Sequence, residues 1–484
     1  MAKKNFLTGR EKELQESAER YEESKEKGIT PYLDAYDYAD LTDWYVMRQQ
    51  MAQAEEALED GLSMHPDSEA LLIEKCHLLL DNGKVEEAYE LSERMDTNNS
   101  DPAIILRGNI LLQQGRTKEA KEQFERIHDK DELYNIIDIC YAYLDNDYIV
   151  EASMWMEIGE SKYGHEEPLV ALKADFHYHV ERYEDAIGCY NELIDMNPYS
   201  PVYWTGIARC YYAIEAFNNA IESCDYALVS DENYREALTI KAQSFASLDN
   251  HEESFKCYAK LNEIGALSDA AWNDLKAMHL MDEGRYDEAM ALFRRIEKDP
   301  NRGKDYRMEG YRAYNMGLCM IEKLDFEAAH DYFTKATDIQ PDLSDAYLQD
   351  GVALVMLDRE PEALLAWEMA VKVSPTALTL FDLGRVCTET GHLNMAIKSF
   401  QMAKELNSDL PLLNEYLALV YLHQDKRKEF EEANRNAIFT FPKEVISQIY
   451  AKLDKATPLA RIQIAQQYFE QYVLIPSNHL KRYS

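Results

Sequence analysis

One pattern recurs along most of this chain, with a usual step of 32–35 residues, and it limits the possible folds more than any other feature. In the clearest copy, residues 310–343, an apolar helical face that includes Gly317 is followed by a short break. A second apolar helix, which includes Phe333, ends at Pro341 because proline cannot donate the next backbone hydrogen bond. A period of this length predicts an all-α array of helix-turn-helix units that pack on their neighbours. We number the copies repeats 1–12; they begin near residues 35, 69, 101, 133, 167, 201, 235, 270, 310, 344, 377 and 411.

Small and bulky residues occupy fixed columns, counted from the first residue of each repeat. The twentieth position is alanine except at Ser254 and Phe430. We predict that bulky side chains fill the space beside small ones, because a larger residue in a small column would overpack by roughly 1–3 kcal/mol. The eighth position is small: Thr42, Cys76, Gly108, Cys140, Ala174, Ala208, Ala242, Ala277, Gly317, Gly351, Gly384 and Ala418. The twenty-fourth is mostly bulky: Leu58, Phe124, Met156, Tyr190, Tyr258, Phe293, Phe333, Trp367 and Phe400.

These columns resemble the tetratricopeptide repeat, a helix-turn-helix unit of about 34 residues. Residues 201–234 are similar to its motif at Trp204, Ala208 and Ala220, with Glu232 where proline is usual. The resemblance covers the whole repeating stretch. It implies a right-handed α-solenoid, or superhelix, that binds other proteins or peptides and carries no catalytic activity.

The repeat boundaries and the composition divide the chain into four expected parts. The step from repeat 8 to repeat 9 is 40 residues, and the added residues fall in the polar stretch 298–307, which is either a flexible joint or an extension of the next helix. A helix expected at 8–27 has a thin apolar face of Leu14, Ala18 and Tyr21, and either caps repeat 1 or stays mobile. The expected parts are a charged N-terminal helix or cap at 1–34, about eight repeats at 35–309, about four at 310–442, and capping helices with a tail at 443–484.

The charge balance is strongly acidic. Lys and Arg number 51 against 89 Asp and Glu, which gives a formal net charge of −38. Such a surface repels nucleic acid and anionic membranes, so we expect neither as a partner. Two interpretations stay open: attraction of a basic partner, or simply a soluble surface. The first residues contain no apolar leader and no stretch is long enough to span a membrane, so a cytoplasmic protein is expected.

The sequence contains no arrangement typical of a cofactor, a metal site or a catalytic centre. None of the eight cysteines forms a C-x-x-C pair, so they are expected to be buried as small apolar residues. His177 and His179 point in different directions on a helix and do not make a metal site. No glycine-rich phosphate loop or nucleophile elbow is present. We therefore expect no cofactor, no metal and no enzyme.

The resemblance places a concave groove along the first helix of each repeat, at its second, fifth, ninth, twelfth and thirteenth positions. These positions are rich in tyrosine, whose rigid ring and polar tip suit a peptide-binding surface, although tyrosines can also fill the space between helices. Tyr36, Asp43, His77 and Asn109 occupy such positions in repeats 1–3. The residues that we select as the candidate partner-binding site are Tyr134, Tyr141, Asp175, Tyr178, Arg209, Tyr212, Gln243, Tyr311, Tyr314 and Arg385.

The function expected from these observations is a non-enzymatic scaffold or adaptor that binds a protein or an extended peptide in the groove. The alternative is a peptide-sensing regulator whose superhelix changes pitch when a ligand binds, for which the stretch 298–307 would be the joint. A subgroup of the family grips the C-terminal carboxylate of chaperones, but Ile105 stands where that clamp needs lysine. Chaperone C-terminal peptides are therefore not expected as ligands. Neither the partner's identity nor the oligomeric state follows from the sequence.

Overall fold

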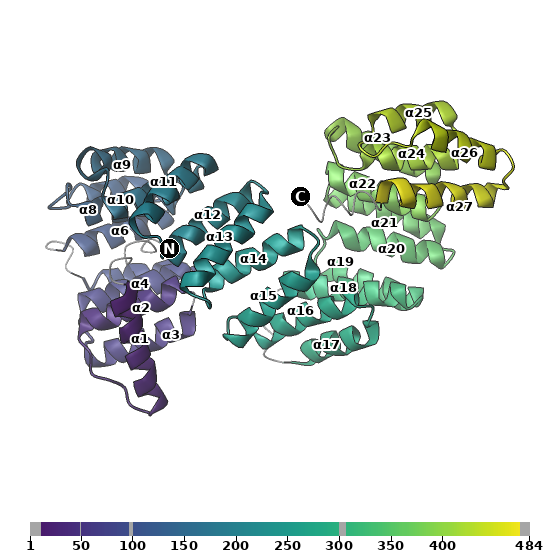
Figure 1. The fold of residues 1–484 in the computed structure, drawn as a ribbon. Helices are drawn as coiled ribbons and strands as arrows, with labels where there is room; N and C mark the ends of the chain where they lie inside the picture. The colour runs from purple at the N-terminus through teal and green to yellow at the C-terminus, as the bar shows by residue number, and fades with distance from the viewer. Residues whose placement is uncertain (1–10, 49, 96–99, 300–305, 475–484) are drawn as a thin grey trace. The chain divides into compact units, whose positions relative to one another are not determined.

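The computed structural model describes residues 11–48, 50–95, 100–299 and 306–474. Within these ranges the chain forms 27 α-helices and one short π-helix, with no strand (Figure 1). The all-α solenoid of helix-turn-helix repeats predicted from the sequence is therefore confirmed. Contacts divide the chain into two compact units, one ending at Ala266 and the other beginning at Leu267.

The first unit contains one N-terminal helix followed by repeats 1–7. In every repeat the first helix has an even number and the second has an odd number. The helices of this unit are α1 (Glu11–Glu26), α2 (Ala35–Met47), α3 (Met51–Met64), α4 (Glu69–Asp81), α5 (Val85–Ser92), α6 (Asp101–Gln113), α7 (Thr117–Phe124), α8 (Leu133–Leu144), α9 (Ile149–Tyr163), α10 (Glu167–His179), α11 (Tyr183–Met196), α12 (Pro201–Ala213), α13 (Phe217–Ser230), α14 (Arg235–Ser247) and α15 (His251–Glu263).

The second unit contains repeats 8–12 and the C-terminal helices. Its elements are α16 (Asp269–Asp282), α17 (Tyr286–Lys298), α18 (Tyr306–Glu322), α19 (Phe326–Ile339), α20 (Ser344–Met356), α21 (Glu360–Val373), α22 (Ala377–Glu389), α23 (Leu393–Leu406), α24 (Leu413–His423), α25 (Arg427–Asn436), α26 (Lys443–Leu453), α27 (Pro458–Phe469) and the π-helix η1 (Glu470–Leu474). Outside repeats 8, 9 and 12, every first helix begins at the residue predicted from the sequence pattern.

The small and bulky columns meet as predicted. Within repeat 10, a Cβ atom added to Gly351 would collide with the indole of Trp367, and Gly317 and Phe333 show the same relationship in repeat 9. Gly108 lies in the same way against the ring of Phe124. Glycine at the eighth position therefore lets the aromatic residue at the twenty-fourth position reach the first helix of its own repeat.

In repeats 2–12 the tight turn between the two helices places one residue in the left-handed backbone region, at the fifteenth position. Gly83 has φ +71° in repeat 2, and the non-glycine residues Asp147 and Leu324 have φ 62° and 59°. Sequence reasoning found no glycine in the turn of repeat 4 and left its boundary open. Asp147 takes that conformation instead, which aspartate tolerates better than most residues.

The described residues of the N-terminal helix α1 pack on repeat 1, and a role of this helix as a cap stays a prediction. Leu14, Ala18 and Tyr21 are 6%, 4% and 3% exposed. The Tyr21 hydroxyl donates a hydrogen bond of 2.7 Å to Asp60 on α3, and Lys25 forms ion pairs with Asp60 and Glu56. These contacts explain how a helix with so thin an apolar face is held in place.

The connection between repeats 8 and 9 was expected to be either a joint or an extension of the next helix. Helix α18 begins at Tyr306, ahead of the repeat start near residue 310, so part of the added length is helical. Residues 300–305 lie outside the described residues, and a flexible joint there stays a prediction. The boundary expected between residues 309 and 310 also stays a prediction. The two compact units meet between Ala266 and Leu267, and this division by contacts does not test where one part of the repeat array ends.

All eight cysteines are free thiols, and all except Cys189 are buried, in agreement with their expected role as small apolar residues. In Cys76 and Cys210 burial raises the pKa of the thiol to about 12, which keeps it protonated at neutral pH.

Among the helices that the structure describes, none combines the length and apolarity needed to cross a membrane.

Candidate functional site

The first helices of repeats 1–4 lie side by side and enclose a groove of about 350 Å³. All the residues that line it come from α2, α4, α6 and α8 or from the residue just before α4. This is the helix set on which the sequence pattern places a concave binding surface. The lining residues are Tyr36, Ala39, Asp40, Asp43, Ser68, Glu69, Ala70, Ile73, Glu74, His77, Pro102, Ile105, Leu106, Asn109, Asp138 and Ala142.

The groove combines acidic side chains with an apolar floor. Of the described residues that line it, five are carboxylates and none is lysine or arginine. The buried side chains of Ile73, Ile105 and Leu106 supply the floor, at 8%, 6% and 2% exposure. The groove therefore offers negative charge and apolar contact together, which suits a chain segment that carries both basic and aliphatic groups.

Two columns of the repeat bring the polar groups to this surface. The ninth position supplies Asp43, His77 and Asn109, all of which the sequence pattern assigns to the groove. The sixth position supplies three acids, which sequence reasoning missed because the family pattern does not use that position: Asp40, Glu74 and Asp138. The signal that could have found them is the acid at the sixth position in three of the first four repeats.

Neighbouring side chains hold part of this lining in place. Asn146, just after α8, donates a hydrogen bond of 3.0 Å from its amide to the side-chain oxygen of Asn109, which is 6% exposed. The Ser100 hydroxyl donates to the Glu69 carboxylate. The groove wall is thus fixed by contacts between consecutive repeats. Among the described residues, no three His, Cys, Asp or Glu side chains are arranged to hold a metal ion.

Four of the ten predicted site residues come together in one network across repeats 4–6. The Asp175 carboxylate accepts hydrogen bonds from the hydroxyls of Tyr141 and Tyr190, at 2.8 and 2.6 Å. Arg209 donates to the Tyr190 hydroxyl at 3.3 Å, and its guanidinium lies over the ring of Tyr178 at 5.2 Å. Burial and the neighbouring Asp175 raise the pKa of Tyr190 well above its usual value. These side chains tie α8, α10, α11 and α12 together.

The network gives Tyr141 a more buried position than a groove residue needs. It is 6% exposed and belongs to the apolar core around α8. Its substitution would therefore remove contacts between repeats as well as any contact with a ligand. A role in partner binding for these four residues stays a prediction.

The other predicted site residues of the first unit lie apart from this network. Tyr134 on α8 is 53% exposed, and Gln243 on α14 is also exposed. The ring of Tyr212 packs edge-on against Phe217, with 5.5 Å between centroids. None of the three lines the acidic groove.

The predicted site residues of the second unit lie on α18 and α22. Tyr311 is 45% exposed, whereas the Tyr314 ring packs at 5.9 Å from Phe333. Arg385 forms an ion pair of 3.3 Å with Asp382 on its own helix. Their part in binding also stays a prediction.

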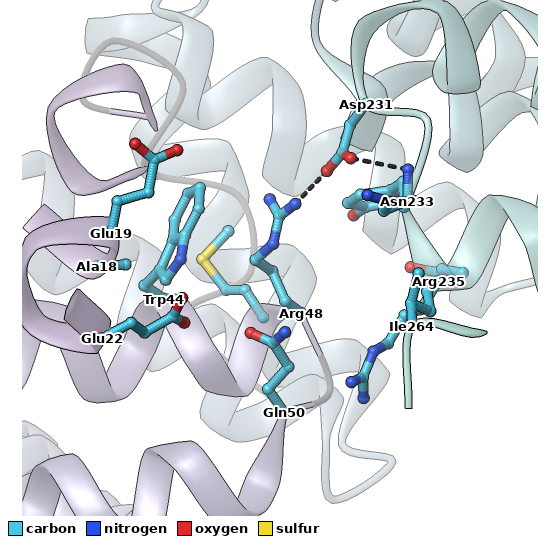
Figure 2. A pocket seen from close by; sticks show the side chains of 13 residues that line it. Ala18, Glu19, Glu22, Trp44, Arg48, Gln50, Asp231, Asn233, Arg235 and Ile264 are labelled. Carbon is cyan, nitrogen blue, oxygen red and sulfur yellow. Dashed lines mark hydrogen bonds and ion pairs between the residues drawn. The ribbon is translucent and has the colours of Figure 1, made fainter. Parts of the chain in front are cut away.

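A second pocket, of about 340 Å³, lies within the first unit where distant repeats meet (Figure 2). Arg48, directly after α2, forms an ion pair with Asp231, directly after α13, although the two residues are 183 positions apart. The Arg48 guanidinium also lies over the Trp44 ring at 4.6 Å. The expectation that each repeat contacts only its neighbours is therefore wrong here, because repeat 1 touches the end of repeat 6.

The comparisons with known proteins identify the repeat type. Residues 172–237, which form most of repeat 5, all of repeat 6 and the start of repeat 7, match the family model described as tetratricopeptide repeat. Anaphase-promoting complex subunit 3 of Schizosaccharomyces pombe is 24% identical over 219 residues, which cover 45% of this chain and 32% of that protein. RNA polymerase II-associated protein 3 of Rattus norvegicus is 23% identical over 191 residues, covering 38% of this chain and 29% of the relative. The matched segments thus span about a third of the length of these relatives.

Two solved structures align with this chain at low sequence identity. A chain in the crystal structure of the APC/C hetero-tetramer Cut9-Hcn1 aligns with this protein at 14% identity and a TM-score of 0.36. The alignment covers 86% of this chain and 97% of the Cut9-Hcn1 chain. The crystal structure of a tetratricopeptide repeat protein from Parabacteroides merdae aligns at 14% identity and a TM-score of 0.36. That alignment covers 60% of this chain and 98% of the Parabacteroides chain. TM-scores this low say nothing about the function of this chain.

Proposed function

We propose a function for this chain from the premise that it is a tetratricopeptide-repeat protein, a type of protein that typically serves as a protein-interaction scaffold. In this proposal the chain is a non-enzymatic scaffold. It binds an extended basic segment of another protein in the groove of α2, α4, α6 and α8. The cytoplasmic location expected from the sequence is part of the same proposal.

The observation that carries the proposal is the groove lining that the structure describes, with five carboxylates, an apolar floor and no lysine or arginine among these residues. A lysine or arginine side chain can donate to a carboxylate while its aliphatic stem covers an apolar surface. Hydrogen bonds between charged groups are roughly twice as strong as those between neutral groups. A basic segment would therefore match both kinds of surface at once.

The overall charge of −38 supports the same partner through a different effect. A large field of one sign accelerates the approach of an oppositely charged partner and is screened by salt. The groove carboxylates, in contrast, act at short range after the encounter. Added salt should therefore slow the association of the basic segment, which depends on the overall charge, more than it changes the dissociation rate, which depends on the groove contacts.

Fluorescence anisotropy with a labelled Lys/Arg-rich peptide tests the proposal. We expect the double substitution Asp40→Asn with Asp43→Asn to weaken binding by about tenfold or more, since it removes two groove charges. The matched control is Glu184→Gln with Asp185→Asn on the exposed part of α11, which removes the same charge outside the groove. Equal losses for the two variants would show that the peptide responds to overall acidity and not to the groove.

The alternative, a regulator that changes conformation on binding, has one observation in its favour. The Arg48–Asp231 ion pair joins distant repeats of the first unit beside a pocket. Both side chains are about a fifth exposed, at 23% and 19%, and such a pair contributes about 1 kcal/mol or less. Small-angle scattering with and without the basic peptide distinguishes the two functions, because a rigid scaffold keeps its dimensions.

A further inference from the structure

An apolar stripe runs along the solvent side of α9, the second helix of repeat 4. Val150, Met154 and Ile158 are 70%, 62% and 38% exposed. They are four residues apart, so they follow one another along the helix surface. On the opposite side of the same helix, Ala152 and Met156 are buried in the repeat core. Helix α9 therefore presents apolar side chains on two faces, although the core uses only one.

The fold does not require this second apolar face. The corresponding positions of the next repeat, on α11, hold Glu184, Gly188 and Glu192, and all three are exposed. Second helices in such arrays normally turn a polar face to water. An exposed apolar stripe that interrupts such a series is typical of a surface that a partner covers.

Acidic residues border the stripe on both sides. At 100° per residue, Glu157 falls on one flank of the Val150–Met154–Ile158 line and Glu151 falls on the other. Both glutamates are exposed, and Lys162, further along the flank of Glu151, forms an ion pair of 2.7 Å with Asp131. The surface thus has an apolar centre with a predominantly negative rim.

This charge pattern decides between the possible occupants. A second copy of the chain seated with α9 against α9 would bring the glutamates of both copies together, which like-charge repulsion disfavours. An anionic membrane surface is repelled for the same reason. A helix with an apolar stripe and basic flanks matches both the centre and the rim.

We propose that the outer face of α9 is a docking site for a basic amphipathic helix of a partner protein. The site goes beyond the proposed groove function, because the groove is lined by α2, α4, α6 and α8 and none of the stripe residues belongs to it. Partner helices bind such a surface by placing apolar side chains at intervals of three and four residues along the stripe. One partner with an extended basic segment and a basic helix could occupy both sites.

The test uses a designed amphipathic peptide of leucine and lysine with a photo-crosslinking group, and its counterpart with glutamate in place of lysine. In anisotropy titrations of the full chain, we expect Val150→Ser with Met154→Ser to lower the affinity for the basic peptide at least tenfold. The matched control, Leu364→Ser with Leu365→Ser, removes two leucines that are 41% and 62% exposed on α21, and should leave the affinity unchanged. Because the groove also takes basic segments, each variant is measured in the Asp40→Asn with Asp43→Asn background, and the acidic peptide should not bind.

Crosslinks from the basic peptide should map to α9. Equal affinity for the stripe variant and the α21 control, or crosslinks spread over other helices, would overturn the proposal. If sedimentation instead shows a dimer that the Val150→Ser with Met154→Ser variant abolishes, the stripe is an interface between copies of the chain, and the proposal is also overturned. Circular dichroism of each variant confirms that the repeat fold is intact.

Discussion

Arg312 on α18 and Asp274 on α16 form a bidentate ion pair, with Nε–Oδ1 at 2.8 Å and Nη2–Oδ2 at 2.6 Å. Their side chains are only 5% and 8% exposed. The pair joins the first helices of repeats 8 and 9, on either side of the long connection. It thus fixes repeat 9 on repeat 8 independently of the chain between them.

Removing one partner of this pair should be strongly destabilising. We expect Asp274→Ala to lower the free energy of unfolding by about 3–5 kcal/mol, because it leaves a buried guanidinium without its charge partner. The comparison is Asp287→Ala, which removes the partner of Lys323 in an exposed pair between the same two repeats and should cost about 1 kcal/mol or less. Urea unfolding followed by circular dichroism measures both, and similar losses would mean that the buried pair does not hold the repeats together.

A single methyl group should distinguish the packed glycines from the free ones. Gly351→Ala would push against the Trp367 indole, whose Nε1 donates a hydrogen bond of 3.1 Å to the Leu348 carbonyl, and should cost roughly 1–3 kcal/mol. Gly188→Ala on α11 meets no atom within 4 Å and should stabilise the helix by about 0.5–1 kcal/mol. Thermal unfolding of the two variants therefore should shift in opposite directions. A stabilising Gly351→Ala would contradict the packing of small against bulky columns.

The turn of repeat 9 should be improved by glycine. Leu324 adopts φ 59° and is 73% exposed, so it carries backbone strain without burying its side chain. Leu324→Gly should raise the free energy of unfolding by about 1 kcal/mol, since glycine adopts this conformation freely. The reverse change at the same turn position, Gly391→Ala with φ +82° in repeat 11, should lower it by a similar amount. Denaturant midpoints that fail to move in opposite directions would rule out strain as the cause.

Acid should destabilise the second unit through His423 at the end of α24. Burial lowers the pKa of this imidazole to about 4 from 6.5, and neither ring nitrogen has a hydrogen-bond partner among the described residues. Between these two values the unfolded chain binds a proton that the folded chain does not, so stability is full above pH 6.5 and falls as the pH drops towards 4. The loss is about 3 kcal/mol at most.

The substitution His423→Gln should flatten this part of the stability profile. The control is His165→Gln, because the His165 side chain is 99% exposed. When the free energy of unfolding is plotted against pH from 7 to 4, the slope should be smaller for His423→Gln than for the unsubstituted chain, and unchanged for His165→Gln. An unchanged slope would show that another group causes the acid sensitivity.

The sequence predicted the repeats because their packing is local. Gly351 and Trp367 lie within one repeat, and the same two columns recur at a fixed spacing, so the pattern alone indicated which residues meet. The left-handed turn position was harder to predict, because aspartate and leucine occupy it as well as glycine. The fifteenth position is the same in each case, and only the backbone angles reveal it.

The site was less predictable because it depends on contacts between repeats. The acids of the sixth position were missed, although Asp40, Glu74 and Asp138 all line the groove. Tyr141 was expected at the groove surface but turns into the core to reach Asp175. The ninth position of repeat 4 could not predict this burial of Tyr141, because Asp175, which accepts the hydrogen bond from its hydroxyl, lies in repeat 5.

The Arg48–Asp231 contact depends on a longer range still. Small rotations from one repeat to the next accumulate over six repeats before these two residues meet, and no local pattern encodes their sum. The Arg312–Asp274 pair was missed for a related reason, since it spans the irregular step between repeats 8 and 9.

Zero-length carbodiimide crosslinking tests most directly whether the acidic groove binds a basic segment. The reagent joins a carboxylate to a lysine amine that touches it, and mass spectrometry then identifies which of the 89 Asp and Glu residues were joined to a lysine-rich peptide. The account predicts that the crosslinks concentrate on Asp40, Asp43, Glu69, Glu74 and Asp138. Crosslinks distributed over the acidic surface in proportion to exposure, with no excess at these five residues, would contradict it.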